Sequence, residues 1–379
     1  MPDNYFLMKI LFITNTFPPN ICGVGDYTFF LCRQFVQRGD KCVVVCRKDD
    51  CQRDAVEGIS VYSVVEKWNK SASEIVLGVI ENEKPDIVSL QYVPHGFDAK
   101  GLPFGIIPIV RNIHKTGIPI FTFIHEPFVM INDCNPKHLF VALCERFITG
   151  YVIKKSARVA TSILNYKNRL SWYDDSIRLI PIPSNIPLLT ADDEKKNSLR
   201  HGIDADGKLV VALFGVRDKN SILKAFSNIF ERRKDIKLLI LGKSDWDENQ
   251  PDWVYRTGKL SAEKLAEYFN IVDIFVLPEK VSRRMKRGGV CLKSGSLAAA
   301  IQYRLPFLTA CGDHTDQVLK DKLMFADFSN ADDVELKLTT LLNDSSLREK
   351  MSSGYGDLLN ELTWEHTYQE YKNIINEIL

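Results

Sequence analysis

The chain has 379 residues, of which 45% are hydrophobic and 26% are charged. These fractions are ordinary for a folded globular protein, and they exclude a disordered chain, a collagen-like repeat and a coiled-coil rod. Lys and Arg total 49 against 48 for Asp and Glu, so the whole molecule has almost no net charge with which to attract nucleic acid or an acidic bilayer. Any anion that it binds must therefore meet a local group of basic residues.

The first half of the chain alternates short apolar runs with longer helical patterns. The apolar runs lack polar alternation, which is typical of strands in a parallel sheet covered on both faces. Predicted strands are 9–15, 41–47, 86–92, 118–124, 158–162 and 178–182, and predicted helices are 27–38, 73–83 and 136–155. This order predicts one doubly wound sheet over about the first 185 residues.

A proline-rich segment from Pro181 to Pro187 interrupts this pattern. Because these prolines exclude a helix or a central strand, we place a domain boundary here. A second series follows, with predicted strands 209–215, 237–242, 254–258, 273–278 and 306–310 and predicted helices 221–232, 261–270 and 294–304. The pattern predicts Rossmann-like domains over 1–186 and 187–363 and a final amphipathic helix over 364–379. The two open sheets are expected to face a cleft lined by the carboxyl ends of their strands.

The cysteines and the first residues of the chain indicate the cellular compartment. Nine cysteines are an odd number, and they form no CxxC pair. This pattern favours reduced thiols and a cytoplasmic protein. The start lacks the basic and apolar segments of a signal peptide, and no window reaches the ~18 uninterrupted apolar residues of a membrane-spanning helix. We therefore expect neither secretion nor insertion into a membrane.

Two glycines precede the first predicted helix. Gly23 and Gly25 lie in a loop after the first strand, whereas a dinucleotide-binding fold needs a tight GxGxxG turn at this place. Nicotinamide and flavin cofactors are therefore not expected. Glycines before a helix let a ligand approach free backbone N–H groups. The alternative interpretation is that the two glycines only form a turn that leads into the helix and bind no ligand.

Polar side chains end two of the predicted strands. His125 stands at the carboxyl end of a central strand, where side chains are expected to point into the cleft. A functional role and a structural role are both open for this histidine. Gln91 and His95 follow another strand and offer hydrogen bonds to a polyhydroxyl ligand, although His95 is expected to face solvent.

The second half of the chain places cations after two of its strands. Arg217 and Lys219 follow the first of these strands, and Arg283 and Arg284 open the most basic window in the chain. A run of charges is usually a solvated face. In a chain of net charge +1, however, such a run beside an expected cleft also suggests an anion site.

The helix predicted at 294–304 begins beside this basic window. Ser294 is expected to be its N-cap, which leaves the amides of the next three residues free for phosphate oxygens. A diphosphate is the predicted ligand of the four residues at this position, Lys293, Ser294, Gly295 and Ser296.

The sequence gives little indication of a metal site. Asp245 and Asp247 have a DxD spacing that some enzymes use for a divalent ion, but they lie in a polar loop, where aspartates are common. No HExxH, GxSxG or Walker A sequence occurs, which excludes the common metalloprotease, hydrolase and P-loop functions. We expect no metal site.

The order of these segments resembles the family 4 type of retaining glycosyltransferases, which have the GT-B fold. The matching segments are Pro18-Pro19, Gly23-Val24-Gly25-Asp26-Tyr27, Gln91-Tyr92-Val93-Pro94, His125, Phe214-Gly215, Gly258-Lys259-Leu260-Ser261, Val281-Ser282-Arg283-Arg284, Gly295-Ser296-Leu297 and Leu305-Pro306-Phe307. The resemblance spans nearly the whole chain. Trp364-Glu365 is similar to the start of the final helix, which in this family crosses back to the first domain.

This resemblance implies a UDP- or GDP-linked sugar on the second domain and a glycan or lipid-linked acceptor on the first. His125 would contact the donor sugar, and Arg217, Lys219 and the region from Arg283 to Lys293 would neutralise the leaving diphosphate. The implied enzyme is a hexosyltransferase that works with retention of configuration and without a metal or other cofactor. Its product would belong to a cell-surface polysaccharide.

The sequence differs from the family where a pair of glutamates is expected before the strand at Pro306. Cys291 and Ala299 occupy these positions, and Glu279 is the candidate substitute for the carboxylate that would hold the ribose. Two alternatives to a transferase therefore stay open. One is a sugar-nucleotide epimerase of the same fold, and the other is a catalytically silent protein that binds a nucleotide or a glycan.

A lipid-linked acceptor would bring the protein to the inner face of the membrane. Lys154, Lys155 and Arg158 form a small basic patch that could make such a peripheral contact. We expect no nucleic-acid partner, because the chain as a whole is nearly neutral.

Overall fold

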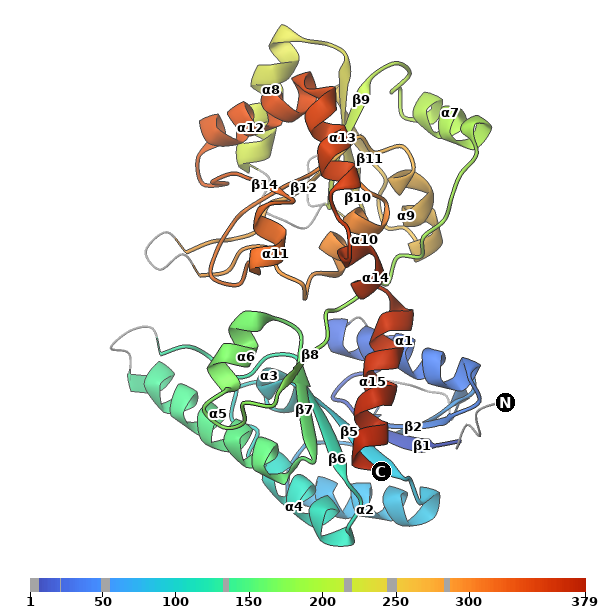
Figure 1. Cartoon of the computed structure of the whole chain (residues 1–379), viewed down its shortest axis with the longest axis vertical. Helices are drawn as coiled ribbons and strands as arrows, with labels where there is room; N and C mark the ends of the chain where they lie inside the picture. The colour runs from blue at the N-terminus through green and yellow to red at the C-terminus, as the bar shows by residue number, and fades with distance from the viewer. Residues whose placement is uncertain are drawn as a thin grey trace. The chain divides into compact units, whose positions relative to one another are not determined.

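The computed structural model describes residues 7–20, 22–48, 55–131, 136–214, 220–243, 251–282 and 287–379. The chain forms two compact units: unit 1 contains Met1–Pro181 and Trp364–Leu379, and unit 2 contains Ile182–Thr363. Each unit is a β-sheet with helices packed on both of its faces (Figure 1). None of the helices in these ranges has the length and apolar character that crossing a bilayer would need.

Unit 1 is built on an eight-stranded sheet with the order β3-β4-β2-β1-β5-β6-β7-β8. Neighbouring strands are parallel except for β3 and β4, which are antiparallel. The strands are β1 Lys9–Ile13, β2 Lys41–Arg47, β3 Ala55–Val56, β4 Ile59–Val65, β5 Ile87–Tyr92, β6 Ile120–Ile124, β7 Arg158–Thr161 and β8 Arg178–Leu179. In the central strand β1, Ile10 aligns with Cys42 of β2 and with Ile87 of β5.

The helices of unit 1 cover both faces of this sheet. They are α1 Gly23–Gln37, α2 Lys70–Glu83, α3 Pro94–Phe97, α4 Ile106–Thr116, α5 Pro136–Lys155, α6 Leu164–Leu170 and α15 Trp364–Ile378. Successive side chains of a strand point to opposite faces. Thus Leu11 and Ile13 pack in one core with α2 and α4, whereas Phe12 contacts Phe35 of α1 on the other face. On that face α15 lies beside α1, and its Tyr371 packs edge-on against Phe121 of β6.

Unit 2 is built on a parallel six-stranded sheet with the order β11-β10-β9-β12-β13-β14. The strands are β9 Leu209–Phe214, β10 Ile236–Leu241, β11 Val254–Arg256, β12 Ile274–Leu277, β13 Phe307–Thr309 and β14 Met324–Phe325. The helices are α7 Asp193–Gly202, α8 Asn220–Arg232, α9 Ala262–Phe269, α10 Gly295–Gln302, α11 Gln317–Lys320, α12 Ala331–Asn343, α13 Ser345–Ser353 and α14 Leu358–Glu361. Val211 and Leu213 pack with α8 and α12 on one face, and Phe275 stacks on Phe269 of α9 on the other.

The predicted α/β class with two doubly wound sheets is confirmed. The bounds of β2, α5 and α8 agree closely with the sequence pattern. The sequence pattern did not predict the β3–β4 hairpin, because β4 lies near a sheet edge and mixes buried with partly exposed residues instead of forming one apolar run. It also missed α4, in which Pro108 stands in the first turn, where proline is tolerated. Elements α3, α6, α7, β14 and α11 to α14 were not predicted either.

Candidate functional site

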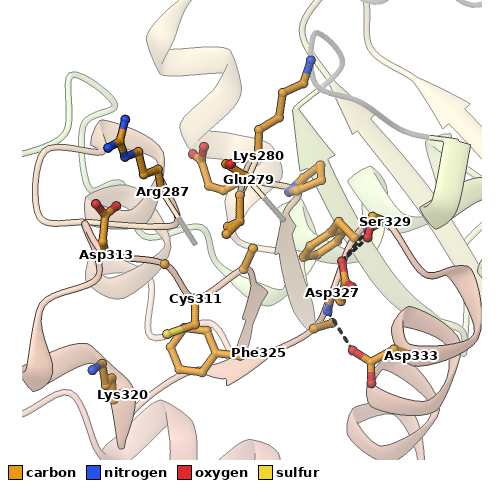
Figure 2. Close-up of a pocket in the computed structure, with 17 residues that line it drawn as sticks. Glu279, Lys280, Arg287, Cys311, Asp313, Lys320, Phe325, Asp327, Ser329 and Asp333 are labelled. Atoms are coloured by element: carbon orange, nitrogen blue, oxygen red, sulfur yellow. Dashed lines mark hydrogen bonds between the residues drawn. The ribbon is translucent and has the colours of Figure 1, made fainter. Parts of the chain in front are cut away.

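A cavity of about 1280 Å³ opens in unit 2 at the carboxyl ends of β12, β13 and β14. Its walls are the segments that directly follow these strands, at 278–282, 310–313 and 325–329, with Arg287, Lys320 and Asp333 (Figure 2). Open parallel sheets bind their ligands at this edge. The position and size of the cavity therefore make it the candidate functional site of unit 2.

The chain turns back on itself after β12 and so brings Arg287 to the cavity. Ser282 donates its N–H to the carbonyl of Arg287 at 2.9 Å, and Gly289 donates to the carbonyl of Lys280 at 3.4 Å. Gly288 has a φ of 98°, and a Cβ at this position would lie 2.3 Å from the Lys280 carbonyl oxygen. Only glycine fits both conditions, so Gly288 is required for the return of the chain.

Cations on the cavity wall are suited to an anionic ligand. The Nη1 atom of Arg287 is buried and has no hydrogen-bond partner among the described residues. A buried donor without a partner is costly, so this atom indicates a place for an acceptor oxygen of a ligand. Lys280 and Lys320 add two further cations to the wall. The aromatic rings of Phe325 and Phe328 give the cavity an apolar surface beside these charges.

The aspartates of the cavity hold its walls together. Asp327 accepts hydrogen bonds from the N–H and the hydroxyl of Ser329, and Asp333 accepts the N–H of Asp327 at 2.7 Å (Figure 2). Asp313 accepts the N–H of Gly288 at 2.8 Å. These three carboxylates thus fix the loops after β12 and β14. None of the three was singled out by sequence analysis, because scattered aspartates in loops carry no distinctive pattern.

Glu279 is the sequence-predicted residue that the structure places on the cavity wall. Burial raises the pKa of Cys291 to about 11; the carboxylates of Asp316 and Glu279 also raise it, and Lys293 opposes them. Glu279 and Lys293, which come from separate loops, are thus both close enough to Cys291 to influence its charge.

The start of α10 has the predicted cap. Ser294 is the N-cap, and its Oγ accepts the N–H of Leu297 at 3.3 Å. The expectation that the Leu297 amide is free is therefore wrong, because the capping side chain already occupies it. Gly295 and Ser296 are the first residues of the helix, at the positive end of its dipole. Their part in binding a ligand stays a prediction.

Several predicted residues lie outside the part of the chain that the structure describes. They are Arg217, Lys219, Arg283, Arg284, Asp245 and Asp247. Their predicted roles stay predictions.

His125 follows β6 in unit 1, but its ring does not lie at an open edge. The residue is 2% exposed, and its Nε2 lies 3.0 Å from Oε1 of Gln91 on β5. The ring also packs edge-on against Tyr27 of α1 at 5.0 Å. Gln91 is itself buried, and its amide donates to the hydroxyl of Ser89 at 2.9 Å. Both side chains, expected at a ligand site, are thus engaged in contacts within unit 1.

The glycine segment also differs from the expectation. Helix α1 begins at Gly23, earlier than predicted, so Gly23 and Gly25 lie inside its first turn rather than before it. Asp26 closes this turn by donating its N–H to the carbonyl of Cys22 at 2.8 Å. A Cβ at Gly25 would lie 2.6 Å from the carbonyl oxygen of Thr16, whereas no described atom lies within 4 Å of one at Gly23. Gly25 is therefore needed for the close packing of α1 against Thr16, whereas a side chain at position 23 would meet no described neighbouring atom.

A histidine–carboxylate pair was missed by sequence analysis. His95 is half exposed, as expected, and its Nδ1 lies 3.4 Å from Oε1 of Glu145 on α5. Burial raises the pKa of the Glu145 carboxyl, while the N–H that it accepts from Val129 at 2.6 Å and the nearby His95 act in the opposite direction. The two residues lie on separate helices, so no local sequence pattern predicts the pair.

Comparison with known proteins names the fold. No protein-family model and no curated protein sequence matches the chain. Among solved structures, HepE of Anabaena in complex with UDP and glucose is similar with a TM-score of 0.68 and 11% identity, over 98% of this chain and 100% of HepE. A glycosyltransferase from Rickettsia africae has a TM-score of 0.69 and 13% identity, over 99% of each chain. The chain has the GT-B fold.

A UDP-N-acetylglucosamine 2-epimerase is also similar, with a TM-score of 0.57 and 12% identity over 94% of each chain. The GT-B fold inferred from the sequence resemblance is thus confirmed. At these low identities the similarity establishes the fold and leaves the reaction to be argued from the site.

Proposed function

We propose that the protein is a glycosyltransferase that moves a sugar from a UDP- or GDP-linked donor to a glycan or lipid-linked acceptor. The observation that carries this proposal is the cavity of unit 2 on a GT-B fold, with the Nη1 of Arg287 buried in its wall and without a partner in the described part of the chain. The similar structure HepE is in complex with UDP and glucose, which supports a nucleotide sugar as donor.

Unit 2 binds the donor in this proposal. A diphosphate carries two or more negative charges, which Arg287, Lys280 and Lys320 of the cavity wall are suited to neutralise. Lys293 and the amides at the start of α10 add donors for the diphosphate, and the carboxylate of Glu279 would hold a ribose hydroxyl. Fixed cations and amides stabilise the leaving diphosphate as its charge develops, so the reaction requires no metal or other cofactor.

Unit 1 binds the acceptor in this proposal, and the residues matched by the family resemblance are His125, Gly23 and Gly25. His125 is buried and donates its Nε2–H to Oε1 of Gln91, which fixes its ring; the family resemblance assigns this histidine a contact with the donor sugar. The acceptor hydroxyl attacks the face that the diphosphate leaves, and the leaving phosphate takes its proton. A hexosyltransferase of family 4 type, acting with retention, needs no protein nucleophile for this step.

The proposed setting is the cytoplasm, at the inner face of the membrane, where lipid-linked acceptors of a cell-surface polysaccharide are available. The basic residues Lys154, Lys155 and Arg158 support a peripheral contact there. No nucleic-acid partner is part of the proposal.

A second candidate function is a sugar-nucleotide epimerase, which the similarity to a UDP-N-acetylglucosamine 2-epimerase favours. An epimerase also needs a nucleotide-sugar site with cations for a diphosphate, so the cavity does not distinguish the two functions. Their products do, because an epimerase isomerises the sugar of the nucleotide sugar without any acceptor.

Donor binding is tested by calorimetric titration of UDP and GDP into the wild type and two variants. Arg287→Gln is expected to weaken binding of the preferred nucleotide at least tenfold, because it removes a charge-assisted contact to a phosphate. Arg233→Gln is the matched control, since Arg233 pairs with Asp235 just before the start of β10, at the opposite edge of the same sheet. Equal affinities in the two variants, or no binding of either nucleotide, would contradict the proposed donor site.

The reaction is tested by incubating UDP-[14C]glucose or GDP-[14C]mannose with a bacterial lipid extract as the source of acceptors. Radiolabel in the lipid or glycan fraction supports transfer, and NMR of the product reports whether the anomeric configuration is retained. An isomerised donor in the absence of lipid supports the epimerase instead. Nucleotide binding without either product identifies a catalytically silent protein.

A further inference from the structure

Unit 2 has a second cavity, at the end of its sheet opposite to the cavity around Arg287. Its volume is about 460 Å³, and it is lined by residues that directly precede β12 and β13 and by one side of α13. The cavity around Arg287 lies at the carboxyl ends of the same two strands. Because β12 has four residues, its length of ~13 Å separates the two cavities. A ligand of the second cavity is therefore distinct from the one bound beside Arg287.

Two arginines bring positive charge to the second cavity. Arg304 follows α10 and is exposed, and its guanidinium has no hydrogen-bond or ion-pair partner in the part of the chain that the structure describes. Arg348 of α13 is partly buried, and its Nη1 donates to the carbonyls of Leu341 at 2.6 Å and Leu342 at 3.1 Å. These two carbonyls lie at the end of α12 and hold the guanidinium in place. One cation of the cavity is therefore positioned before any ligand arrives.

One side of α13 completes the cavity with polar side chains. Ser345, Arg348, Glu349 and Ser352 all line it. At 100° per residue these four positions fall within about 100° of one another around the helix. The hydroxyls of Ser345 and Ser352 have no hydrogen-bond partner among the described residues. Both hydroxyls can therefore donate to a ligand.

The two carboxylates that line the cavity differ in how their charge is compensated. Asp273 is paired with Arg200, whose Nη2 lies 3.0 Å from its Oδ2, and the same carboxylate accepts the N–H of Val210 at 2.8 Å. Glu349 is exposed and has no cationic partner within the described ranges. The two arginines of the lining outnumber this single uncompensated carboxylate. The second cavity thus offers two cations for an anion and one carboxylate that can accept hydrogen bonds from hydroxyl groups.

We propose that the second cavity binds a small phosphate ester with free hydroxyl groups, of the sugar phosphate class. The guanidinium groups of Arg304 and Arg348 are suited to phosphate oxygens. Ser345 and Ser352 add hydroxyl donors, and Glu349 accepts from the hydroxyls of the sugar. The carboxylate of Glu349 would repel a bare phosphate ion, so it favours an anion that also carries hydroxyls.

The size and lining of the second cavity agree with this class of ligand. Its volume of about 460 Å³ falls within the ~300–1,000 Å³ that is typical of small-molecule sites. The described residues of its lining include no aromatic side chain on which a nucleotide base could stack. A sugar phosphate is therefore a better occupant than a nucleotide. The inference does not rest on the proposed function, because the second cavity lies apart from the cavity around Arg287.

The experiment is calorimetric titration of inorganic phosphate, ribose 5-phosphate and ribose into the full chain. Ribose 5-phosphate is expected to bind at least tenfold more tightly than inorganic phosphate, and ribose is expected not to bind. Arg304→Gln should weaken binding of ribose 5-phosphate tenfold or more, because it removes a charge-assisted contact to the phosphate. Glu349→Gln should tighten binding of inorganic phosphate and reduce the preference for ribose 5-phosphate.

Lys350→Gln is the matched control, since Lys350 is exposed on the same helix but lies on the side away from the cavity and loses the same charge. A wild type that binds neither phosphate compound, or equal affinities in Arg304→Gln and Lys350→Gln, overturns the inference. Displacement of ribose 5-phosphate by UDP, together with loss of its binding in Arg287→Gln, would place the ligand in the other cavity and also overturn it.

Melting temperature and UDP affinity are measured on the same variants. Both are expected to stay unchanged in Arg304→Gln, because this side chain makes no contact that the fold or the other cavity needs. Weak UDP binding by the wild type would count against the proposed function alone, whereas weak ribose 5-phosphate binding would count against this inference alone.

Discussion

Gly23 and Gly25 look alike in the sequence, but the structure gives them different surroundings. Both stand in the first turn of α1. Gly25 lies against the backbone of the segment between β1 and α1, where a side chain would strike the Thr16 carbonyl. Gly23 has open space in the direction of a Cβ. A close approach of backbones, rather than a ligand, therefore accounts for the second glycine.

This difference predicts opposite effects of the same substitution. Gly25→Ala is expected to lower the free energy of unfolding by about 1–3 kcal/mol, because the added methyl group forces α1 away from Thr16. Gly23→Ala is expected to leave it unchanged or to raise it by about 0.5 kcal/mol, because alanine favours a helix. Urea denaturation followed by circular dichroism measures both variants. Similar losses in the two would show that the close contact at Gly25 does not matter.

At the scale of an element, α15 is held to unit 1 by aromatic rings and by one buried ion pair. Tyr368 packs on Phe35 of α1 at 4.9 Å. Nζ of Lys372 lies 3.2 Å from Oδ2 of Asp40, and the two side chains are only 12% and 3% exposed. Asp40 also accepts the N–H of Met8 at 2.9 Å. The pair thus joins the last helix to the loop before β2 and to the start of β1.

Removing one partner of this pair is expected to be costly, because the other charge stays buried. Lys372→Met is predicted to lower the free energy of unfolding by about 3–5 kcal/mol, with the apolar stem of the side chain retained. Asn373→Ala, at an exposed position of the same helix, is the control and is expected to change it by less than about 0.5 kcal/mol. Guanidinium denaturation measures both, and a loss in Lys372→Met no larger than that of the control would rule out a stabilising pair.

At the scale of the whole molecule, the two units differ in how the chain builds them. Unit 2 is one continuous segment, whereas unit 1 is completed by Trp364–Leu379 from the end of the chain. Tyr371 of this segment contacts Phe121 and Phe123 of β6. One face of the unit 1 sheet is therefore covered by a segment that follows unit 2 in the chain.

Deletion of 364–379 is expected to destabilise unit 1 and to leave unit 2 folded. Hydrogen exchange with mass spectrometry is the measurement, because it reports on each unit by its own peptides. Peptides from α1 and β6 should lose protection, since the rings of Phe35, Phe121 and Phe123 lose their cover. Peptides from β9 and β10 should keep theirs. Unchanged protection in α1 and β6 would contradict the structural role assigned to α15.

The sequence by itself determined the features that depend on neighbouring residues. Apolar runs without alternation predicted the strands of both sheets except β3, β4 and β14. The prolines from Pro181 to Pro187 predicted the break between the two series, and Ser294 was recognised as a helix cap. The order of short motifs further predicted the GT-B fold. These signals are local, because strand burial, helix capping and proline geometry act within a few residues.

Only the tertiary structure decided which side chains meet. The burial of His125 depends on Tyr27 of α1 and Gln91 of β5, and the cavity around Arg287 depends on loops that follow three separate strands. Such contacts join residues far apart in the chain, and their geometry follows from strand order and helix packing, which a local sequence pattern does not encode.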